Sequence, residues 1–163
     1  MKKYKFTGEI KQVGDITLKR IQAVADFGII KSGDIGGWIE KEENLSQHGD
    51  AWVYGDAWVY GDARVYGNAR VYGDARVCGD AEVCGNRHLL IIGPIGSRYG
   101  FTTFFRDKDG DITVLCGCFC GKIDKFLERV TKTHKDSRHA LVYRTAVEIA
   151  KLHIDLSNKA GKA

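Results

Sequence analysis

The 163-residue sequence contains one proline and one methionine, and no apolar run that approaches the length of a membrane span. A membrane helix needs about 20 predominantly apolar residues, so we expect no transmembrane segment. The N-terminus begins Met-Lys-Lys-Tyr-Lys without an apolar stretch behind it, which argues against a secretory signal peptide. Cysteine is present five times, an odd number, and without an export signal we expect reduced thiols in a cytoplasmic protein.

Glycine, by contrast, is abundant, and most of the 20 glycines belong to one periodic block. From Gly49 six hexads follow without interruption: GDAWVY, GDAWVY, GDARVY, GNARVY, GDARVC and GDAEVC. In each hexad Ala and Val stand two positions apart, so in a strand they share one face and the residue between them points away. Glycine followed by Asp or Asn provides a turn, because glycine tolerates positive φ. The repeat therefore predicts short strands that close into a coil.

The repeat resembles the left-handed parallel β-helix of hexapeptide-repeat proteins, in which three hexads make one turn of about 18 residues. This resemblance implies a mainly β fold in which the valines of successive turns stack on one another. On the outside, it places Trp52 over Arg70 and Trp58 over Arg76 as cation–π pairs. It also places Arg64 over Glu82 as a surface ion pair.

The segment before the hexads contains a weaker copy of the same pattern. Ile39 and Leu45 stand one hexad apart, and the longer spacing from Leu45 to Val53 indicates a two-residue insertion near Gln47 and His48. We therefore expect residues 1–48 to form an N-terminal cap and a degenerate first coil. Residues 49–86 form the β-helix itself.

The periodicity stops at Asn86, and residues 87–163 predict a small α+β domain with three strands and two helices. The expected strands cover residues 88–92, 100–105 and 111–119. A helix with Ile123, Phe126, Leu127 and Val130 on one face follows, and Asp136 is the expected N-cap of a second helix. The order of these elements places both helices on one face of the sheet.

Four short stretches resemble hexapeptide-repeat proteins of bacterial viruses and prophages. Two precede the hexads, GDIGGWIE at residues 33–40 and ENLS at residues 43–46. Two lie in the C-terminal extension, GPIGSR at residues 93–98 and CGCF at residues 116–119. The resemblance implies a viral origin, and several small viral proteins of this kind act against host defences.

The loop from Gly93 to Gly100 is the first candidate binding site. Its glycines allow backbone N–H groups to converge on an anion, and Ser97 and Arg98 could add charge-assisted hydrogen bonds to a phosphate or carboxylate. The candidate binding residues are Gly93, Gly96, Ser97, Arg98 and Tyr99. The loop precedes a strand rather than a helix, so it is neither a P-loop nor a dinucleotide fingerprint, and a plain strand connection remains the alternative.

The outward aromatic residues of the hexads are the second candidate surface. A monomer seldom exposes a large aromatic patch, so we expect these side chains to be buried in a homo-oligomer, a dimer or a trimer. The expected interface residues are Trp52, Tyr54, Trp58, Tyr60, Tyr66 and Tyr72. A foreign protein partner is the alternative. Nucleic acid is not expected as a partner, and the arginines between the rows of aspartates argue against mimicry of a nucleic-acid backbone.

Catalytic and metal-binding motifs are incomplete. His48 lies at the insertion before the coils and His88 follows the last coil, and no acid–base partner accompanies either, so we interpret His48 as a turn residue rather than a general base. Cys116, Cys118 and Cys120 would share one face of a strand, which does not suit a tetrahedral zinc site, and we interpret them as small buried side chains. The turn from Asp107 to Asp111 departs from the spacing of a calcium loop. We therefore assign no catalytic residue, metal or cofactor.

Charge favours an anionic partner for the C-terminal part. Residues 87–163 carry 14 basic and 8 acidic side chains, a net charge of +6. The sequence thus predicts a non-enzymatic binding or inhibitor protein, with the β-helix as the assembly scaffold. The C-terminal domain would contact a host protein or a small anionic ligand. An acyltransferase that uses CoA and a structural component of the virus particle remain alternatives.

Overall fold

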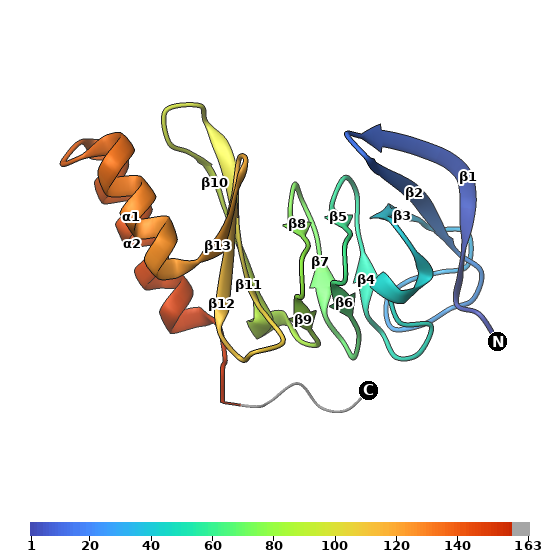
Figure 1. Cartoon of the computed structure of the whole chain (residues 1–163). Coiled ribbons are helices and arrows are strands. Elements are labelled where there is room, and N and C mark those ends of the chain that lie inside the picture. Colours follow the sequence, from blue (N-terminus) through green and yellow to red (C-terminus); the bar gives the residue numbers. More distant parts are fainter. Residues whose placement is uncertain (158–163) are drawn as a thin grey trace.

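Each hexad forms a strand of two residues, in which an outward residue precedes a buried valine. These strands are β4 (Trp52–Val53), β5 (Trp58–Val59), β6 (Arg64–Val65), β7 (Arg70–Val71), β8 (Arg76–Val77) and β9 (Glu82–Val83). In the computed structural model they form the middle of an elongated molecule, between an N-terminal sheet and a C-terminal sheet that carries two helices (Figure 1). The structure describes residues 1–157, so the last six residues of the predicted C-terminal domain lie outside it.

The predicted stacking of the coils is confirmed. Parallel pairing joins valines 18 positions apart: Val53 with Val71, Val59 with Val77, and Val65 with Val83. Three hexads therefore make one turn of a β-solenoid. The alanines and valines of the repeat are at most 1% exposed, and each buried valine contributes about 1.5–3 kcal/mol to stability. This aliphatic column holds the coils together.

The degenerate first coil is also present where the sequence predicts it. Ile39 pairs with Val59 and Leu45 with Val65, and in both cases 20 positions separate the partners, two more than in the regular coils. The extra residues lie between Leu45 and Val53, as expected. The side-chain amide of Asn44 donates to the carbonyls of Gly61 and Ala63, so the irregular coil remains hydrogen-bonded to the next.

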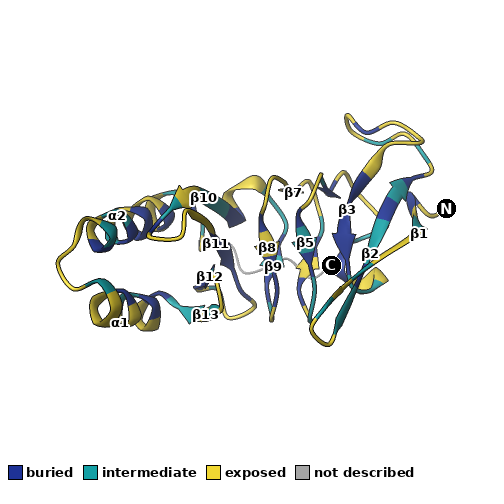
Figure 2. Cartoon of the chain, turned by 90° about the horizontal axis from the view of Figure 1, so that it is seen from above, coloured by how far each residue is buried: buried dark blue, intermediate teal, exposed yellow. Residues whose placement is uncertain are grey.

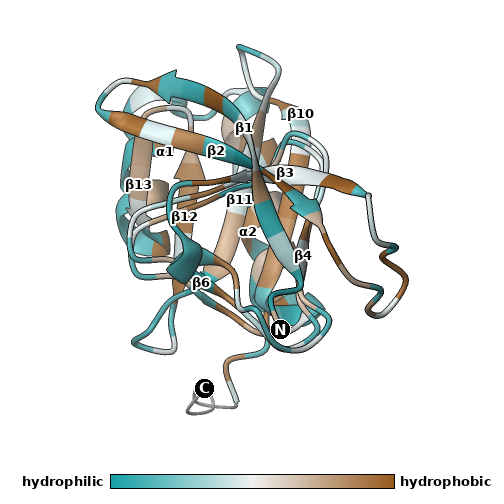
Figure 3. Ribbon diagram, turned by 90° about the vertical axis from the view of Figure 1, so that its right-hand side faces the viewer, coloured by the Kyte–Doolittle hydropathy of each residue, from teal (hydrophilic) through white to brown (hydrophobic). Residues whose placement is uncertain are grey.

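A sheet covers the N-terminal end of the solenoid. Strands β1 (Tyr4–Val13) and β2 (Ile16–Ala23) form an antiparallel hairpin, and β3 (Ile35–Ile39) joins β2 to the parallel stack. The view from this end shows the three strands in front of the coils (Figure 3). The Lys3 ammonium donates to the carbonyls of Gly49 and Ala51, and burial lowers its pKa to about 8.

A second sheet covers the other end. Strands β10 (Leu89–Ile95), β11 (Gly100–Arg106), β12 (Ile112–Cys116) and β13 (Phe119–Lys122) follow one another in an antiparallel meander. One face of this sheet, which includes Phe105 and Leu115, joins the core of the solenoid. The other face, which includes Phe104 and Val114, packs on the helices. Buried residues accordingly lie on both sides of the sheet (Figure 2).

Both helices, α1 (Ile123–His134) and α2 (Arg138–His153), lie on the outer face of the sheet, as predicted. The prediction of three strands is wrong, because Gly117, at φ 57°, turns the expected third strand into the hairpin of β12 and β13. The N-cap of α2 is Ser137 rather than Asp136, since the Ser137 hydroxyl accepts the Ala140 N–H. Within residues 1–157, neither helix is long and apolar enough to cross a bilayer.

Candidate functional site

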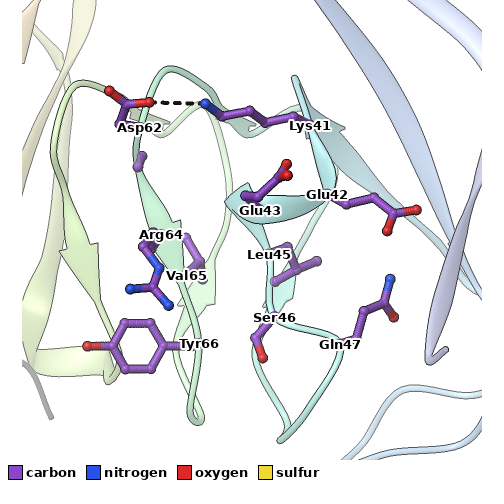
Figure 4. A pocket seen from close by; sticks show the side chains of 11 residues that line it. Lys41, Glu42, Glu43, Leu45, Ser46, Gln47, Asp62, Arg64, Val65 and Tyr66 are labelled. Atoms are coloured by element: carbon purple, nitrogen blue, oxygen red, sulfur yellow. Dashed lines mark hydrogen bonds and ion pairs between the residues drawn. The ribbon is translucent and has the colours of Figure 1, made fainter. Parts of the chain in front are cut away.

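The first of two similar-sized cavities is a groove of about 680 Å³ beside the irregular first coil (Figure 4). Its two cationic side chains both face a carboxylate. The Lys41 ammonium lies 3.0 Å from the Asp62 carboxylate, and the Arg64 guanidinium lies 3.9 Å from Glu82. The groove therefore offers an anionic ligand no unpaired cation among its lining residues.

The second cavity is a cleft of about 650 Å³ between the solenoid and the C-terminal domain. Its volume lies in the range of small-molecule sites. The solenoid contributes Asp74 and Arg76, the loop after β10 contributes Ser97 and Arg98, and the rest comes from the sheet and α1–α2. The remaining lining residues are Ile95, Gly100, Phe101, Thr103, Leu115, Cys116, Gly117, Cys118, Thr133, His134 and Tyr143.

Arg76 is held in the cleft wall by the repeat. Its guanidinium lies 4.0 Å from the ring centroid of Trp58, which is the cation–π pair that the sequence predicts. Its backbone N–H donates to the hydroxyl of Thr103 in β11, which ties the strand to the C-terminal sheet. Stacking on Trp58 covers one face of the guanidinium and leaves its edge available for an anion.

Arg98 reaches the same cleft from the predicted binding loop. The loop turns tightly, with the Tyr99 N–H donating to the Gly96 carbonyl. Gly96 adopts φ 81°, and a Cβ there would lie 1.9 Å from the Tyr143 hydroxyl, so only glycine fits. Among residues 1–157, neither Arg76 nor Arg98 forms an ion pair with a carboxylate. The cleft therefore presents two unpaired guanidinium groups from separate parts of the chain.

An aromatic pair forms another wall of the cleft. The His134 ring stacks on Tyr143 with centroids 5.6 Å apart, and the Cys116 Sγ lies 4.0 Å from the Tyr143 hydroxyl. Burial is the larger cause and the neighbouring Cys116 the smaller, and together they raise the pKa of Tyr143 to about 12. Tyr143 therefore remains a neutral phenol near neutral pH. The cleft thus combines two arginines and the carboxylate of Asp74 with an uncharged aromatic surface.

The predicted binding residues are only partly brought together. Ser97 and Arg98 line the cleft, whereas Gly93 and Gly96 shape the loop that presents them. Tyr99 is 76% exposed and lies outside the lining. Sequence reasoning missed Arg76, His134 and Tyr143 as cleft residues, because they come from other elements. The outward position of Arg76 in its hexad was the one signal that could have placed it on this surface.

The aromatic residues of the predicted oligomer interface are less exposed than expected. Trp52 is 1% exposed, so its assignment to an outer surface is wrong. Tyr4 and Phe27 of the N-terminal cap pack edge-on against its ring. Tyr72 is 52% exposed. The other four are half-buried: Tyr54, Trp58, Tyr60 and Tyr66.

The cysteines also differ from expectation. Because β12 turns back at Gly117, Cys118 and Cys120 are exposed rather than buried, and Cys116 is half-buried. Cys78, which stands where the first four hexads have an outward tyrosine, is only 5% exposed and lies against Cys120 of the C-terminal sheet. Within the described residues, no group of three or more His, Cys, Asp or Glu side chains is arranged to hold a metal ion.

The two histidines near the coils have different surroundings. His48 is exposed at the insertion of the first coil, where its backbone N–H donates to Ser46. His88 is buried, with Nε2 3.1 Å from the Arg106 guanidinium and Nδ1 3.4 Å from the Cys84 Sγ. Both ring nitrogens face a donor, because the Arg106 guanidinium points to Nε2 and the Cys84 backbone N–H donates to Nδ1 at 3.3 Å. Burial and the Arg106 charge lower the pKa of His88.

Comparison with known proteins supports the repeat. A family described as the YdcK β-solenoid repeat matches residues 63–79, which lie within the solenoid. A protein of Escherichia coli (strain K12) described as the uncharacterized acetyltransferase YdcK is 40% identical over 40 residues. The similarity covers 24% of this chain and 12% of that protein, so this chain matches only a small part of its length. The fold and the matching repeat agree that the middle of the chain is a β-solenoid.

Proposed function

We propose that this protein is a non-enzymatic binding protein that captures an anionic ligand in the cleft between the solenoid and the C-terminal domain. The observation that carries the proposal is the convergence of Arg76 and Arg98, neither paired with a carboxylate within residues 1–157, on one cleft. Guanidinium groups bind phosphate and carboxylate through two parallel hydrogen bonds. The Ser97 hydroxyl adds a further donor on the same wall.

The surrounding surface suits an anionic ligand. Tyr143 is a neutral phenol, so it adds no negative charge that would repel an anion. The net charge of +6 over residues 87–163 favours the approach of an anion to this half of the molecule. We also propose that the solenoid is the scaffold of the molecule, wound in the left-handed sense of hexapeptide-repeat proteins.

The test is native mass spectrometry after incubation of the purified protein with a small-molecule extract of bacterial cells. We expect a bound molecule that is released on denaturation and carries a phosphate or carboxylate. Arg98→Ala should weaken its binding about 10-fold or more, because a hydrogen bond to a charged group contributes about 1.5–3 kcal/mol. Arg76→Ala should weaken binding similarly.

The matched control is Arg138→Ala, which removes an exposed arginine at the start of α2, outside the cleft lining. It should bind as the unsubstituted protein does. Equal loss of binding in all three variants would mean that the overall positive charge, and not the cleft, holds the ligand. If no bound molecule is recovered, the proposal of a small-molecule ligand is contradicted.

Acyl transfer is the second candidate, and the similarity to the protein named as an acetyltransferase favours it. In this reading His48 would be the general base. The side chain of His48 has no hydrogen-bond partner among the described residues, whereas a general base needs an orienting group. Acetyl-CoA-dependent acetylation that disappears in His48→Ala would establish this reading in place of the first.

A further inference from the structure

Two free cysteines lie side by side where the solenoid meets the C-terminal sheet. Neither of them lines the cleft. Cys78 ends the fifth hexad, and Cys120 belongs to β13. Their Sγ atoms lie 3.9 Å apart, although 42 positions separate the residues in sequence. Cys78 is buried and Cys120 is exposed, so one sulfur is protected and the other is open to solvent.

The position of this pair follows from the repeat. Cys78 replaces the tyrosine that ends each of the first four hexads, and it lies one turn after Tyr60. A side chain as small as cysteine allows β13 to approach the coil at this point. β13 is the edge strand of its sheet, bonded only to β12, so it can shift more readily than a central strand.

The two thiols differ in acidity. The hydrogen bond with the Cys78 thiol lowers the pKa of Cys120 to about 7, which makes a substantial fraction of it thiolate near neutral pH. The pKa of Cys78 is raised by the same hydrogen bond and by burial, so this sulfur remains a thiol. An exposed thiolate beside a protected thiol is the arrangement of an attacking and a resolving cysteine.

We propose that Cys78 and Cys120 are an oxidisable pair, which hydrogen peroxide converts into a disulfide between the solenoid and β13. The Cys120 thiolate attacks one peroxide oxygen, the O–O bond breaks, and the departing hydroxide takes a proton to form water. Cys78 then attacks the resulting sulfenic acid, the S–O bond breaks, and a second water leaves with the Cys78 proton. Two thiols are oxidised to one disulfide while one peroxide is reduced to two waters.

The disulfide would tie together two walls of the cleft. The β12–β13 turn contributes Cys116, Gly117 and Cys118 to the lining, and β8 contributes Arg76 two residues before Cys78. Closing the bond brings the sulfurs from 3.9 Å to about 2.05 Å, which rotation of the side chains and a small shift of β13 can supply. The proposal does not depend on what the cleft binds.

The test is oxidation of the full chain with hydrogen peroxide under native conditions, followed by intact mass and non-reducing peptide mapping. We expect a loss of two hydrogens and a single cross-linked peptide pair that contains Cys78 and Cys120. Dithiothreitol should restore the original mass. A cross-link that closes a long loop should raise Tm by about 10 °C in the oxidised protein.

Cys120→Ser is the principal variant, because Cys120 is exposed and its replacement should not disturb the core. It should abolish both the cross-link and the rise in Tm, whereas Cys118→Ser, an exposed cysteine of the same hairpin, should leave both unchanged. Cys78→Ala provides a second variant with an apolar side chain of similar size for the buried position. A cross-link through Cys116 or Cys118, or oxidation of Cys120 to higher acids without any cross-link, would overturn the proposal.

Discussion

Lys122 places its ammonium among the three aspartates of the turn from Asp107 to Asp111. Its ammonium is hydrogen-bonded to Asp107 and lies 3.6 Å from Asp109 and 3.9 Å from Asp111. The Asp107 side chain is fully buried and also accepts from the Thr113 hydroxyl. The spacing of the three aspartates argued against calcium, and the structure places the ammonium of a lysine from β13 within 4 Å of all three.

Removal of this lysine should destabilise the protein in a pH-dependent way. Lys122→Met leaves the buried Asp107 carboxylate without its cation, and because the Lys122 side chain is 43% exposed we expect a loss of about 2 kcal/mol at pH 7. Burial alone would raise the pKa of Asp107, but hydrogen bonds from Lys122, Thr113 and the Asp111 amide outweigh burial and lower it.

A lowered folded-state pKa means that the stabilisation is fully present above the unfolded value of 3.8 and is lost as the pH falls through the folded value. The free energies of unfolding of Lys122→Met and the unsubstituted protein, measured with urea from pH 7 to pH 2, should therefore approach each other as the pH falls below 3.8. Lys125→Met is the control, since Lys125 and its partner Glu128 are 72% and 68% exposed. If the difference in the free energy of unfolding stayed the same at low pH, the ion pair of Lys122 and Asp107 would not be its cause.

At the scale of elements, the loop from Gly93 to Gly100 determines whether Arg98 reaches the cleft. Gly96 lies against the Tyr143 hydroxyl with no space for a Cβ, and its φ of 81° is unfavourable for other residues. Gly96→Ala should shift the loop away from α2, cost about 2 kcal/mol or more of stability, and move Arg98 out of the cleft.

The matched control for this substitution is Gly100→Ala, because a Cβ at Gly100 would meet no atom within 4 Å. Thermal unfolding should show a lower Tm for Gly96→Ala and a nearly unchanged Tm for Gly100→Ala. Equal Tm values for the two variants would mean that the contact of Gly96 with Tyr143 does not fix the loop.

The β12–β13 hairpin shows why some elements escaped prediction. The apolar stretch from Ile112 to Phe119 has the composition of one strand, and Gly117 within it did not signal a turn because glycine also occurs inside strands. Two strands of five and four residues replace the single expected one. This difference also changes the candidate site. The residues around the turn, 116–118, line the cleft, and the turn leaves Cys118 and Cys120 exposed.

For the whole molecule, the number of hexads sets the angle between the two end sheets. A turn contains three hexads, so the addition of three hexads between Tyr72 and Gly73 adds one complete turn and keeps the last coil in the same orientation toward the C-terminal sheet. The addition of one hexad rotates the sheet by one third of a turn relative to the N-terminal cap.

We therefore expect the chain with three added GDARVY hexads to unfold cooperatively, with a Tm at or above that of the original protein. The chain with one added hexad should have a lower Tm, because Arg76 then lies over Arg64 instead of Trp58, so a cation–π pair is replaced by two like charges. Circular dichroism and calorimetry measure both properties. Similar stability of the two chains would mean that the end sheets do not depend on the register of the coils.

The sequence by itself determined the repeat, because a six-residue period of glycine, alanine and valine has few ways to bury its aliphatic side chains. It predicted the 18-residue stacking, the two-residue insertion in the first coil and the cation–π pair of Trp58 and Arg76. It also singled out Ser97 and Arg98, because their residue types suit an anion whatever surrounds them.

Only the tertiary structure decided which surfaces remain open. The N-terminal cap buries Trp52, and β13 covers Cys78, although in the sequence both look like outward positions of a regular coil. The cleft likewise exists because the end sheet places Arg98 on the same cleft as Arg76, 22 positions away in sequence. Local patterns record which side of a strand a residue faces, whereas contact between distant elements decides whether that side meets solvent.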